Sequence, residues 1–255
     1  MARIKCKRLR SLEGLDLPLF ELSQDAKILL AFQSPYQEIL IIRFPNGKKG
    51  LMLDGEIQYV EGENSKDYHL KHVKLLYKCP YAAKRVAIVG GGDGILAGEI
   101  LKKFPHARID LYELDPCMVY VYRKYETKVN NNALNDPRVR VIIGDAFRNI
   151  QRVKDGFYTS MFVDLPDAIF DNRLDTLYTP SNFQLLARKL ALGGCMSIYT
   201  GGINPDFMVG QIIPDCMQLL GKEVAYGFLG YYGIILHLRK IIPQCNLKTM
   251  GNYTL

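Results

Sequence analysis

Apolar runs in the first 60 positions are short and are separated by turn signals, as in an antiparallel sheet. Four runs rich in isoleucine, leucine or valine cover residues 26–33, 36–44, 50–53 and 56–60. Asn46-Gly47 and Asp54-Gly55 lie between runs, and both dipeptides favour tight hairpin turns. The pattern predicts a small antiparallel β domain over residues 1–62.

From residue 63 onward, helical and extended patterns alternate, which is typical of a doubly wound α/β sheet. Helical spacing predicts helices at 63–78, 95–104, 116–129, 181–190 and 206–220. Apolar runs predict strands at 86–89, 109–112, 139–143, 158–163, 195–199, 222–229 and 233–239. Because no helix separates the last two, they should form an antiparallel edge hairpin. We therefore expect a seven-stranded Rossmann-like sheet of the methyltransferase type over residues 63–255.

Composition narrows the class of protein. The chain has 255 residues, of which 48% are hydrophobic, as in ordinary globular proteins. No apolar run approaches the roughly 20 residues of a membrane span, and no signal-peptide core follows the basic N-terminus. The six cysteines are scattered without a C-x-x-C pair, so neither a zinc cluster nor a disulfide framework is expected. These features predict a cytoplasmic protein without membrane contact.

The formal net charge of +7 raises the question of a nucleic-acid partner. The basic residues are dispersed along the chain, and the longest basic runs are short. No zinc-finger spacing or aromatic RNA-binding signature accompanies them. The sequence therefore predicts no nucleic-acid partner.

A glycine-rich loop, Gly90-Gly91-Gly92-Asp93-Gly94, follows the first strand of the predicted α/β sheet. Ligands bind at this end of such strands, and Glu113, nineteen residues after the loop, could accept ribose hydroxyls. A dinucleotide is one alternative, because Gly92 to Ala97 fits G-x-G-x-x-A. Asp93 disfavours it, since a carboxylate there repels a pyrophosphate. The Asp93 carboxylate would instead suit the amine of a sulfonium nucleoside. The plainer alternative is that Asp93 caps the helix.

Further acids end the next strands. Asp145 follows the third strand and could accept a hydrogen bond from an adenine amino group or cap a helix. Asp164 and Asp167 end the fourth strand. A carboxylate there could bind an alkylammonium ion and take its proton, while the plainer alternative is a pair of turn-forming residues. The sequence predicts an acidic site for a cation.

These residues, in this order and spacing, resemble the aminopropyltransferase family, to which spermidine synthase belongs. The resemblance runs from about Ser34 to Gly202. Its motifs are Tyr68-His69, Gly90 to Gly94, Tyr112-Glu113-Leu114-Asp115, Gly144-Asp145-Ala146 and the pair Asp164 and Asp167. Leu70 and Leu165-Pro166 depart from the family pattern, and these departures lie on the side of the acceptor amine.

The resemblance implies a reaction: transfer of the aminopropyl group of decarboxylated S-adenosylmethionine to a diamine, with putrescine expected and methylthioadenosine released. It implies no metal, no prosthetic group, and a homodimer or homotetramer assembled through the N-terminal sheet. Two alternatives stay open on the same scaffold. One is an S-adenosylmethionine-dependent N-methyltransferase, and the other is a catalytically silent regulatory homologue.

The resemblance also implies roles for individual residues. Gln37 would contact the ribose side of the donor, Glu113 the ribose hydroxyls, Asp145 and Ala146 the adenine, and Asp93 the donor amine. Asp164 would accept the proton of the attacking amine, Tyr68 and Asp167 would position that amine, and His69 and Gln58 would line the pocket.

Overall fold

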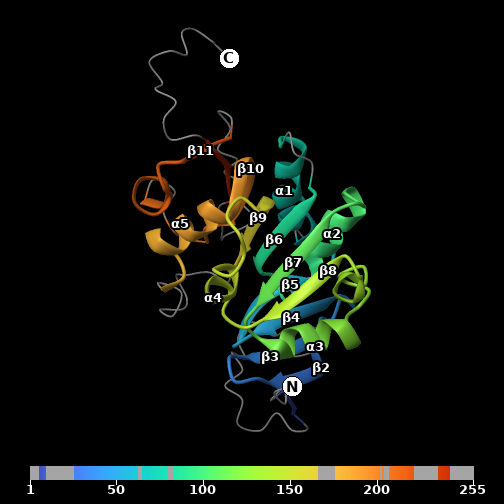
Figure 1. Ribbon diagram of the computed structural model, residues 1–255. Helices are drawn as coiled ribbons and strands as arrows, with labels where there is room; N and C mark the ends of the chain where they lie inside the picture. The colour runs from blue at the N-terminus through green and yellow to red at the C-terminus, as the bar shows by residue number, and fades with distance from the viewer. Residues whose placement is uncertain are drawn as a thin grey trace, which may run out of the picture.

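The computed structural model contains two β-sheets that pack together (Figure 1). It describes residues 6–9, 26–62, 65–79, 83–165, 176–201, 203, 207–220 and 235–241. Within these ranges, no helix combines the length and apolar character needed to cross a bilayer.

The N-terminal sheet is antiparallel, as the hairpin signals predict. Its five strands are, in spatial order, β1 (Lys7–Arg8), β2 (Lys27–Gln33), β3 (Glu38–Arg43), β4 (Lys49–Leu53) and β5 (Glu56–Val60). Gly47 and Gly55 adopt positive φ angles of 81° and 86° in the two turns, a conformation that glycine reaches without steric cost. The predicted domain boundary at residue 62 falls between β5 and the first helix.

The larger sheet has seven strands in the order β11-β12-β10-β9-β6-β7-β8, which confirms the expected fold class. Its strands are β6 (Arg85–Gly90), β7 (Arg108–Glu113), β8 (Val139–Ile143), β9 (Tyr158–Asp164), β10 (Leu190–Tyr199), β11 (Met217–Leu219) and β12 (Ile235–Lys240). Strands β6, β7, β8, β9 and β10 run parallel, and β12 pairs antiparallel with both β10 and β11.

Helices cover the two faces of this sheet. They are α1 (Ser65–Tyr77), α2 (Ile95–Lys103), α3 (Pro116–Lys124), α4 (Ala146–Ile150) and α5 (Pro180–Lys189), with a short 3-10 turn at Ala133–Asn135. Apolar residues of α1, α2 and α3 share one core cluster with the N-terminal sheet, whereas those of α4 and α5 belong to a second cluster on the opposite face. Because strand side chains alternate between faces, β6, β7, β8, β9 and β10 each contribute to both clusters, whereas β11 and β12 contribute only to the second.

Two predicted helices end earlier in the structure than expected. The helix expected at 206–220 is a π-helical turn, Met208–Ile212, followed by strand β11. Pro214 accounts for the break, because proline cannot donate a helical hydrogen bond. The helix expected to reach residue 129 ends at Lys124. The strand expected at 222–229 lies outside the described residues, and the described neighbour of β12 at this edge is β11.

The expectation that the cysteines form no disulfides is wrong. Cys6 is bonded to Cys117 and Cys79 to Cys195, with Cα–Cα distances of 5.2 Å and 6.4 Å. The partners are separated by 111 and 116 residues, so local spacing carries no signal for either bond. The cytoplasmic location, which partly followed from the absence of disulfides, stays a prediction.

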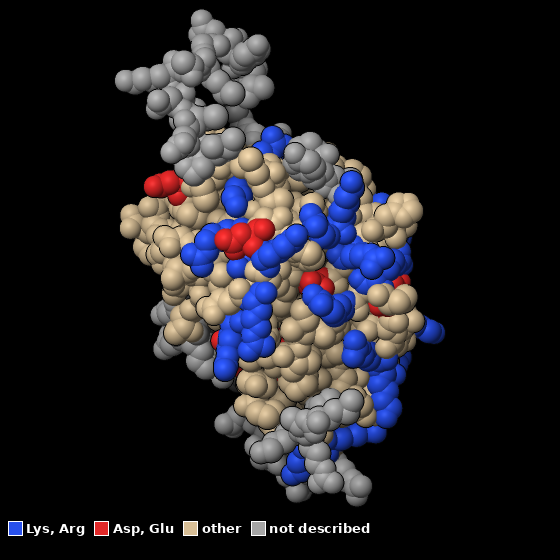
Figure 2. All heavy atoms as spheres, in the orientation of Figure 1, with Lys and Arg blue, Asp and Glu red and all other residues tan. Residues whose placement is uncertain are grey.

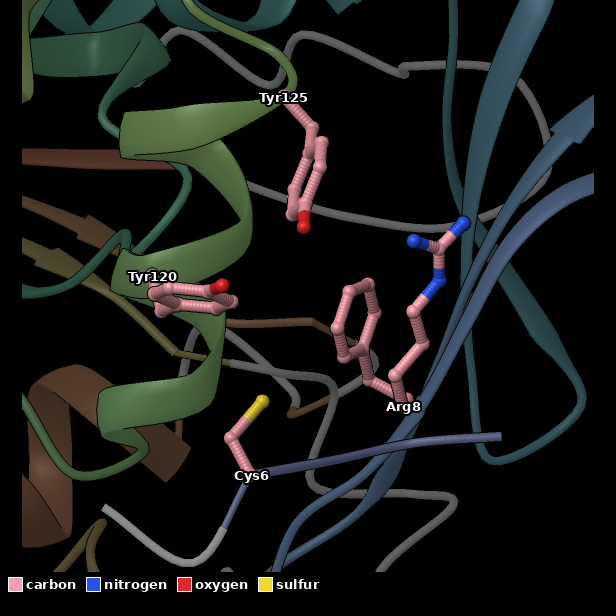
Figure 3. A pocket seen from close by; sticks show the side chains of 5 residues that line it. Cys6, Arg8, Tyr120 and Tyr125 are labelled. Atoms are coloured by element: carbon pink, nitrogen blue, oxygen red, sulfur yellow. The ribbon is translucent and has the colours of Figure 1, made fainter. Parts of the chain in front are cut away.

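Aromatic side chains fill the seam between the two sheets. Phe32 of β2 contacts Tyr120 of α3 and Tyr125, which caps the C-terminus of that helix. The centroid of the Phe32 ring lies 6.2 Å from that of Tyr120 and 5.8 Å from that of Tyr125. Together with Cys6 and Arg8 they line a pocket of about 220 Å³ (Figure 3). None of the carboxylates predicted to bind ligand lines this pocket.

The buried carboxylate of Asp115 joins the same two parts of the chain by hydrogen bonds. Its Oδ2 accepts from Ser34 Oγ at 2.7 Å and from Gln37 Nε2 at 2.9 Å, both in the turn between β2 and β3. Its Oδ1 accepts from the Cys117 backbone N–H at 2.8 Å and so caps α3. This arrangement fixes the turn of the N-terminal sheet at the carboxyl end of β7.

We expect Asp115→Ala to lower the free energy of unfolding by about 3 kcal/mol, because it removes the shared acceptor of the buried Ser34 hydroxyl and the half-buried Gln37 amide together with the cap of α3. Asp145→Ala is the matched control, since Asp145 also caps a helix after a strand but is exposed, and its loss should cost about 1 kcal/mol. Urea unfolding monitored by circular dichroism measures both. Equal losses in the two variants would contradict the linking role of Asp115.

Candidate active site

The sheet register brings the predicted acidic residues to one edge. Gly90 is the neighbour of Asp164 on β9, and Glu113 on β7 is the neighbour of Ile143, two residues before Asp145. All four strands involved are parallel, so their carboxyl ends meet there. The site therefore lies at the carboxyl edge of the sheet, where ligands of open α/β folds bind.

The glycine loop lies directly against the neighbouring strand ends. Gly90 and Gly91 have φ angles of 83° and 67°, and the Gly91 N–H donates to the Asp164 carbonyl oxygen at 3.1 Å. A Cβ atom on Gly90 would collide with that carbonyl, and one on Gly92 would collide with the Glu113 carboxylate. The absence of side chains at Gly90 and Gly92 thus allows Asp164 and Glu113 to approach the backbone of the loop.

Asp93 combines a structural role with a position in the site. Its Oδ1 accepts from the Ile95 N–H at 2.9 Å, so the helix-capping alternative holds for this oxygen. Burial raises the pKa of Asp93, the charge of Asp164 raises it further, and His69 opposes the shift. Asp93, His69 and Asp164 therefore share one electrostatic environment, in which a cationic ligand would relieve the repulsion between the two carboxylates.

Glu113 is the acidic residue whose protonation changes near neutrality. Its Oε1 accepts from the Asp115 N–H at 2.7 Å, and the Gly92 N–H also donates to the carboxylate. Burial raises the pKa of Glu113 to about 7, with further contributions from the charges of Asp115 and Asp93, although the two backbone donors oppose the rise. A ligand that presents hydroxyl donors or positive charge here would favour the ionised form.

Asp164 is held by the phenol of Tyr68. The Tyr68 hydroxyl donates to Asp164 Oδ1, and the tyrosine ring makes edge contacts with His69 and Tyr199, at centroid distances of 4.9 Å and 5.4 Å. Burial and the neighbouring Asp164 charge raise the pKa of Tyr68 well above its ordinary value. Tyr68 therefore remains a hydrogen-bond donor at physiological pH and orients the carboxylate beside the glycine loop.

The remaining predicted residues lie in different surroundings. Asp145 is exposed and its Oδ1 accepts from the Arg148 N–H at 3.1 Å, so it caps α4, which begins at Ala146. Gln37 contacts Asp115, which in turn contacts Glu113. Gln58 is exposed on β5, and Asp167 lies outside the described residues. Their contacts with a ligand stay predictions.

His72 is a neighbour of the site that the sequence analysis missed. It lies one helical turn after Tyr68, contacts that ring at 4.9 Å, and places Nδ1 2.7 Å from Ser197 Oγ in the buried interior. Burial and the nearby histidines lower its pKa well below the ordinary value, so the imidazole is neutral. The four-residue spacing from Tyr68 was the available signal, because such residues share a helix face.

Together these groups suit a ligand that carries positive charge and ribose hydroxyls but no phosphate. The backbone donors of the loop that would bind a pyrophosphate are crowded by Asp93, Glu113 and Asp164. Among the described residues, no group of three potential ligands could hold a metal ion.

Comparison with known proteins identifies the family of this chain. Residues 65–217 match the spermine/spermidine synthase domain. The chain is 36% identical over 184 residues to a polyamine aminopropyltransferase of Corynebacterium efficiens, covering 70% of this chain and 34% of the relative. It is 28% identical to putrescine N-methyltransferase 1 of Nicotiana tabacum over 79% of this chain and 53% of the relative. The chain thus spans only about a third to a half of these two curated relatives.

Solved structures agree at the level of the fold. A spermidine synthase crystallised with the transition state analogue AdoDATO superposes with a TM-score of 0.68 at 23% identity, over 86% of this chain and 75% of that chain. The spermidine synthase of Thermotoga maritima gives a TM-score of 0.65 at 23% identity, over 86% and 74%. With a family match over more than half its length, the chain belongs to the spermine/spermidine synthase family.

Proposed function

We propose that this protein transfers an aminopropyl group from decarboxylated S-adenosylmethionine to a diamine, with putrescine as the expected acceptor. The observation that carries the proposal is the convergence of Asp93 and Asp164 beside the glycine loop, with Tyr68 donating to Asp164. Two carboxylates that share one electrostatic environment suit a reaction in which both the donor and the acceptor are cations.

The donor would lie across the carboxyl ends of β6, β7 and β8. Glu113 would accept the ribose hydroxyls, Asp145 and Ala146 would contact adenine, and Asp93 would pair with the aminopropyl amine. Oδ1 of Asp93 accepts a hydrogen bond from the Ile95 N–H, which leaves Oδ2 for the amine. Gln37 would act on the ribose side from its position beside Asp115.

The acceptor would lie on the Tyr68 side of Asp164. An alkylammonium ion must lose a proton before it can attack, and Asp164 is placed to bind the ion and accept that proton. The amine nitrogen then bonds to the aminopropyl carbon attached to the sulfonium sulfur as that carbon–sulfur bond breaks, and methylthioadenosine leaves. Asp167, His69 and Gln58 are proposed acceptor-side residues, and assembly through the N-terminal sheet is proposed as a dimer or tetramer.

An N-methyltransferase is the second candidate, because the Nicotiana tabacum relative is named putrescine N-methyltransferase. It would use intact S-adenosylmethionine, whose carboxylate would have to lie near Asp93. Asp93 repels that carboxylate, and this repulsion favours the decarboxylated donor.

One experiment tests both candidates. The protein is incubated with decarboxylated or intact S-adenosylmethionine and with putrescine, cadaverine, agmatine or spermidine, and products are identified by mass. We expect methylthioadenosine and an aminopropylated amine from the decarboxylated donor. S-adenosylhomocysteine and a methylated amine would establish the methyltransferase instead, and binding of the donor without any product would indicate a silent homologue.

Asp164→Asn should retain donor affinity and lose roughly 10²–10⁴-fold in kcat, because the amide cannot accept the proton of the amine. Asp145→Asn is the control, since it should change donor affinity rather than kcat. Steady-state kinetics with calorimetric donor binding separates these effects. A kcat of Asp164→Asn close to that of the unaltered protein would remove Asp164 from the mechanism.

Donor affinity should rise between pH 6 and pH 8. With the pKa of Glu113 raised to about 7, its carboxyl is mostly protonated at pH 6 and mostly ionised at pH 8, and the ionised form is the better acceptor for ribose hydroxyls. The dissociation constant should therefore be about tenfold larger at pH 6 than at pH 8. Calorimetry at both values measures it. Glu113→Gln should bind more weakly with most of this dependence removed, and a persistent tenfold change in that variant would assign the titration to another group such as Asp93.

A further inference from the structure

Four arginines gather at the amino ends of β6, β7 and β8, the edge of the sheet opposite the acidic site. Arg85 and Arg108 are register neighbours, and the Ile109 N–H donates to the Arg138 carbonyl at 2.8 Å, which places Arg138 beside Arg108. Arg140 follows two residues later, beside Asp110. Residues distant in the chain thus become adjacent in the sheet.

Three of these side chains leave the sheet on one face. The residues that follow Arg85 and Arg108 are Val86 and Ile109, and Arg140 lies between Val139 and Val141; all four of these neighbours pack in the core cluster shared with α1, α2 and α3. Because side chains alternate along a strand, Arg85, Arg108 and Arg140 point to the other face. Arg138 lies in the turn before β8, where its Nη1 donates to the Pro105 carbonyl oxygen at the same edge of the sheet. We call Arg85, Arg108, Arg138 and Arg140 the arginine face.

Contacts within the arginine face hold its guanidinium groups in place. Arg140 donates from Nε and Nη2 to Asp110 at 2.9 Å and 2.7 Å, yet its side chain stays 67% exposed. Arg138 forms a similar fork with Asp136, and the Arg85 guanidinium lies 4.8 Å above the Phe157 ring. Such fixed groups lose little side-chain entropy when they bind an anion.

The arginine face keeps a net positive charge. Asp110 and Asp136 neutralise two of its members, but Arg108 is exposed and no carboxylate of the described residues pairs with it. Lys84, which precedes Arg85, and Lys154, three residues before Phe157, are exposed as well. Figure 2 shows basic side chains outnumbering acidic ones over the face seen there.

We propose that the arginine face binds the phosphate backbone of a nucleic acid, a partner that the dispersed basic residues of the sequence did not predict, because the sheet register brings arginines together that are far apart in the chain. Guanidinium groups match phosphate oxygens in charge and geometry, and strands spaced about 4.8 Å apart present them as a row. None of these contacts would read a base, so the binding would be independent of sequence. The proposal goes beyond the transferase function, because the acidic residues lie at the opposite edge of the sheet.

An anionic membrane is the less favoured partner. Proteins that lie on bilayers usually insert large apolar side chains beside their basic residues. The exposed large apolar side chains among the described residues include none from β6, from β7 or from the amino end of β8. Phosphates arranged along a chain therefore fit this surface better than a lipid plane.

Binding of a fluorescently labelled 20-nucleotide oligouridylate tests the proposal by anisotropy between 50 and 200 mM salt. The unaltered protein should bind at 50 mM, with affinity falling steeply as salt rises. Arg85→Glu/Arg108→Glu should weaken binding at least tenfold and lower the slope of log K against log salt by about 1.5.

Lys27→Glu/Arg43→Glu is the matched control. These residues are exposed cross-strand neighbours on the N-terminal sheet, so the pair carries the same change in net charge on another surface. It should keep most of the affinity, and thermal unfolding should show both variants folded. An equal loss in the two variants, no binding by the unaltered protein at 50 mM salt, or binding to phosphatidylserine vesicles without binding to the oligonucleotide would each overturn the proposal.

Discussion

The carboxylate of Asp115 is the interaction on which the geometry of the site depends. The carboxylate is buried between two parts of the chain. It accepts hydrogen bonds from the turn at Ser34 and Gln37 and from the Cys117 N–H at the start of α3. Its backbone N–H holds Glu113. A buried charge is stable only when such donors surround it, so the N-terminal sheet and the α/β sheet need each other to satisfy one residue.

This dependence links folding to ligand chemistry. The backbone N–H of Asp115 fixes the direction of Glu113, while Gly92 packs against Glu113 and Gly90 packs against Asp164. Burial raises the pKa of Asp93 and of Glu113, and the charges of neighbouring carboxylates raise both further, so keeping these groups ionised is costly. A cationic ligand would relieve that cost, and part of its affinity would come from the repulsion between the carboxylates.

Local patterns in the sequence predicted most of the fold. The hairpin glycines, the alternation of strands and helices, and the acidic residues at strand ends all depend on residues within a few positions of one another. The errors have nonlocal or overriding causes. Pro214 interrupts an otherwise helical pattern, and the disulfide partners lie more than 100 residues apart. The gathering of the arginines follows from the sheet register, which periodicity alone does not specify. His72 lies one helical turn after Tyr68, so its contact with that ring was predictable from local spacing.

The two disulfides interleave along the chain, because Cys79 lies between Cys6 and Cys117, and Cys195 lies beyond both. A single backbone cleavage anywhere from residue 6 to residue 195 therefore leaves its two fragments covalently joined. In the oxidised molecule, a protease could cut any one surface loop of this stretch without releasing a fragment. Only a reductant would then separate the two fragments.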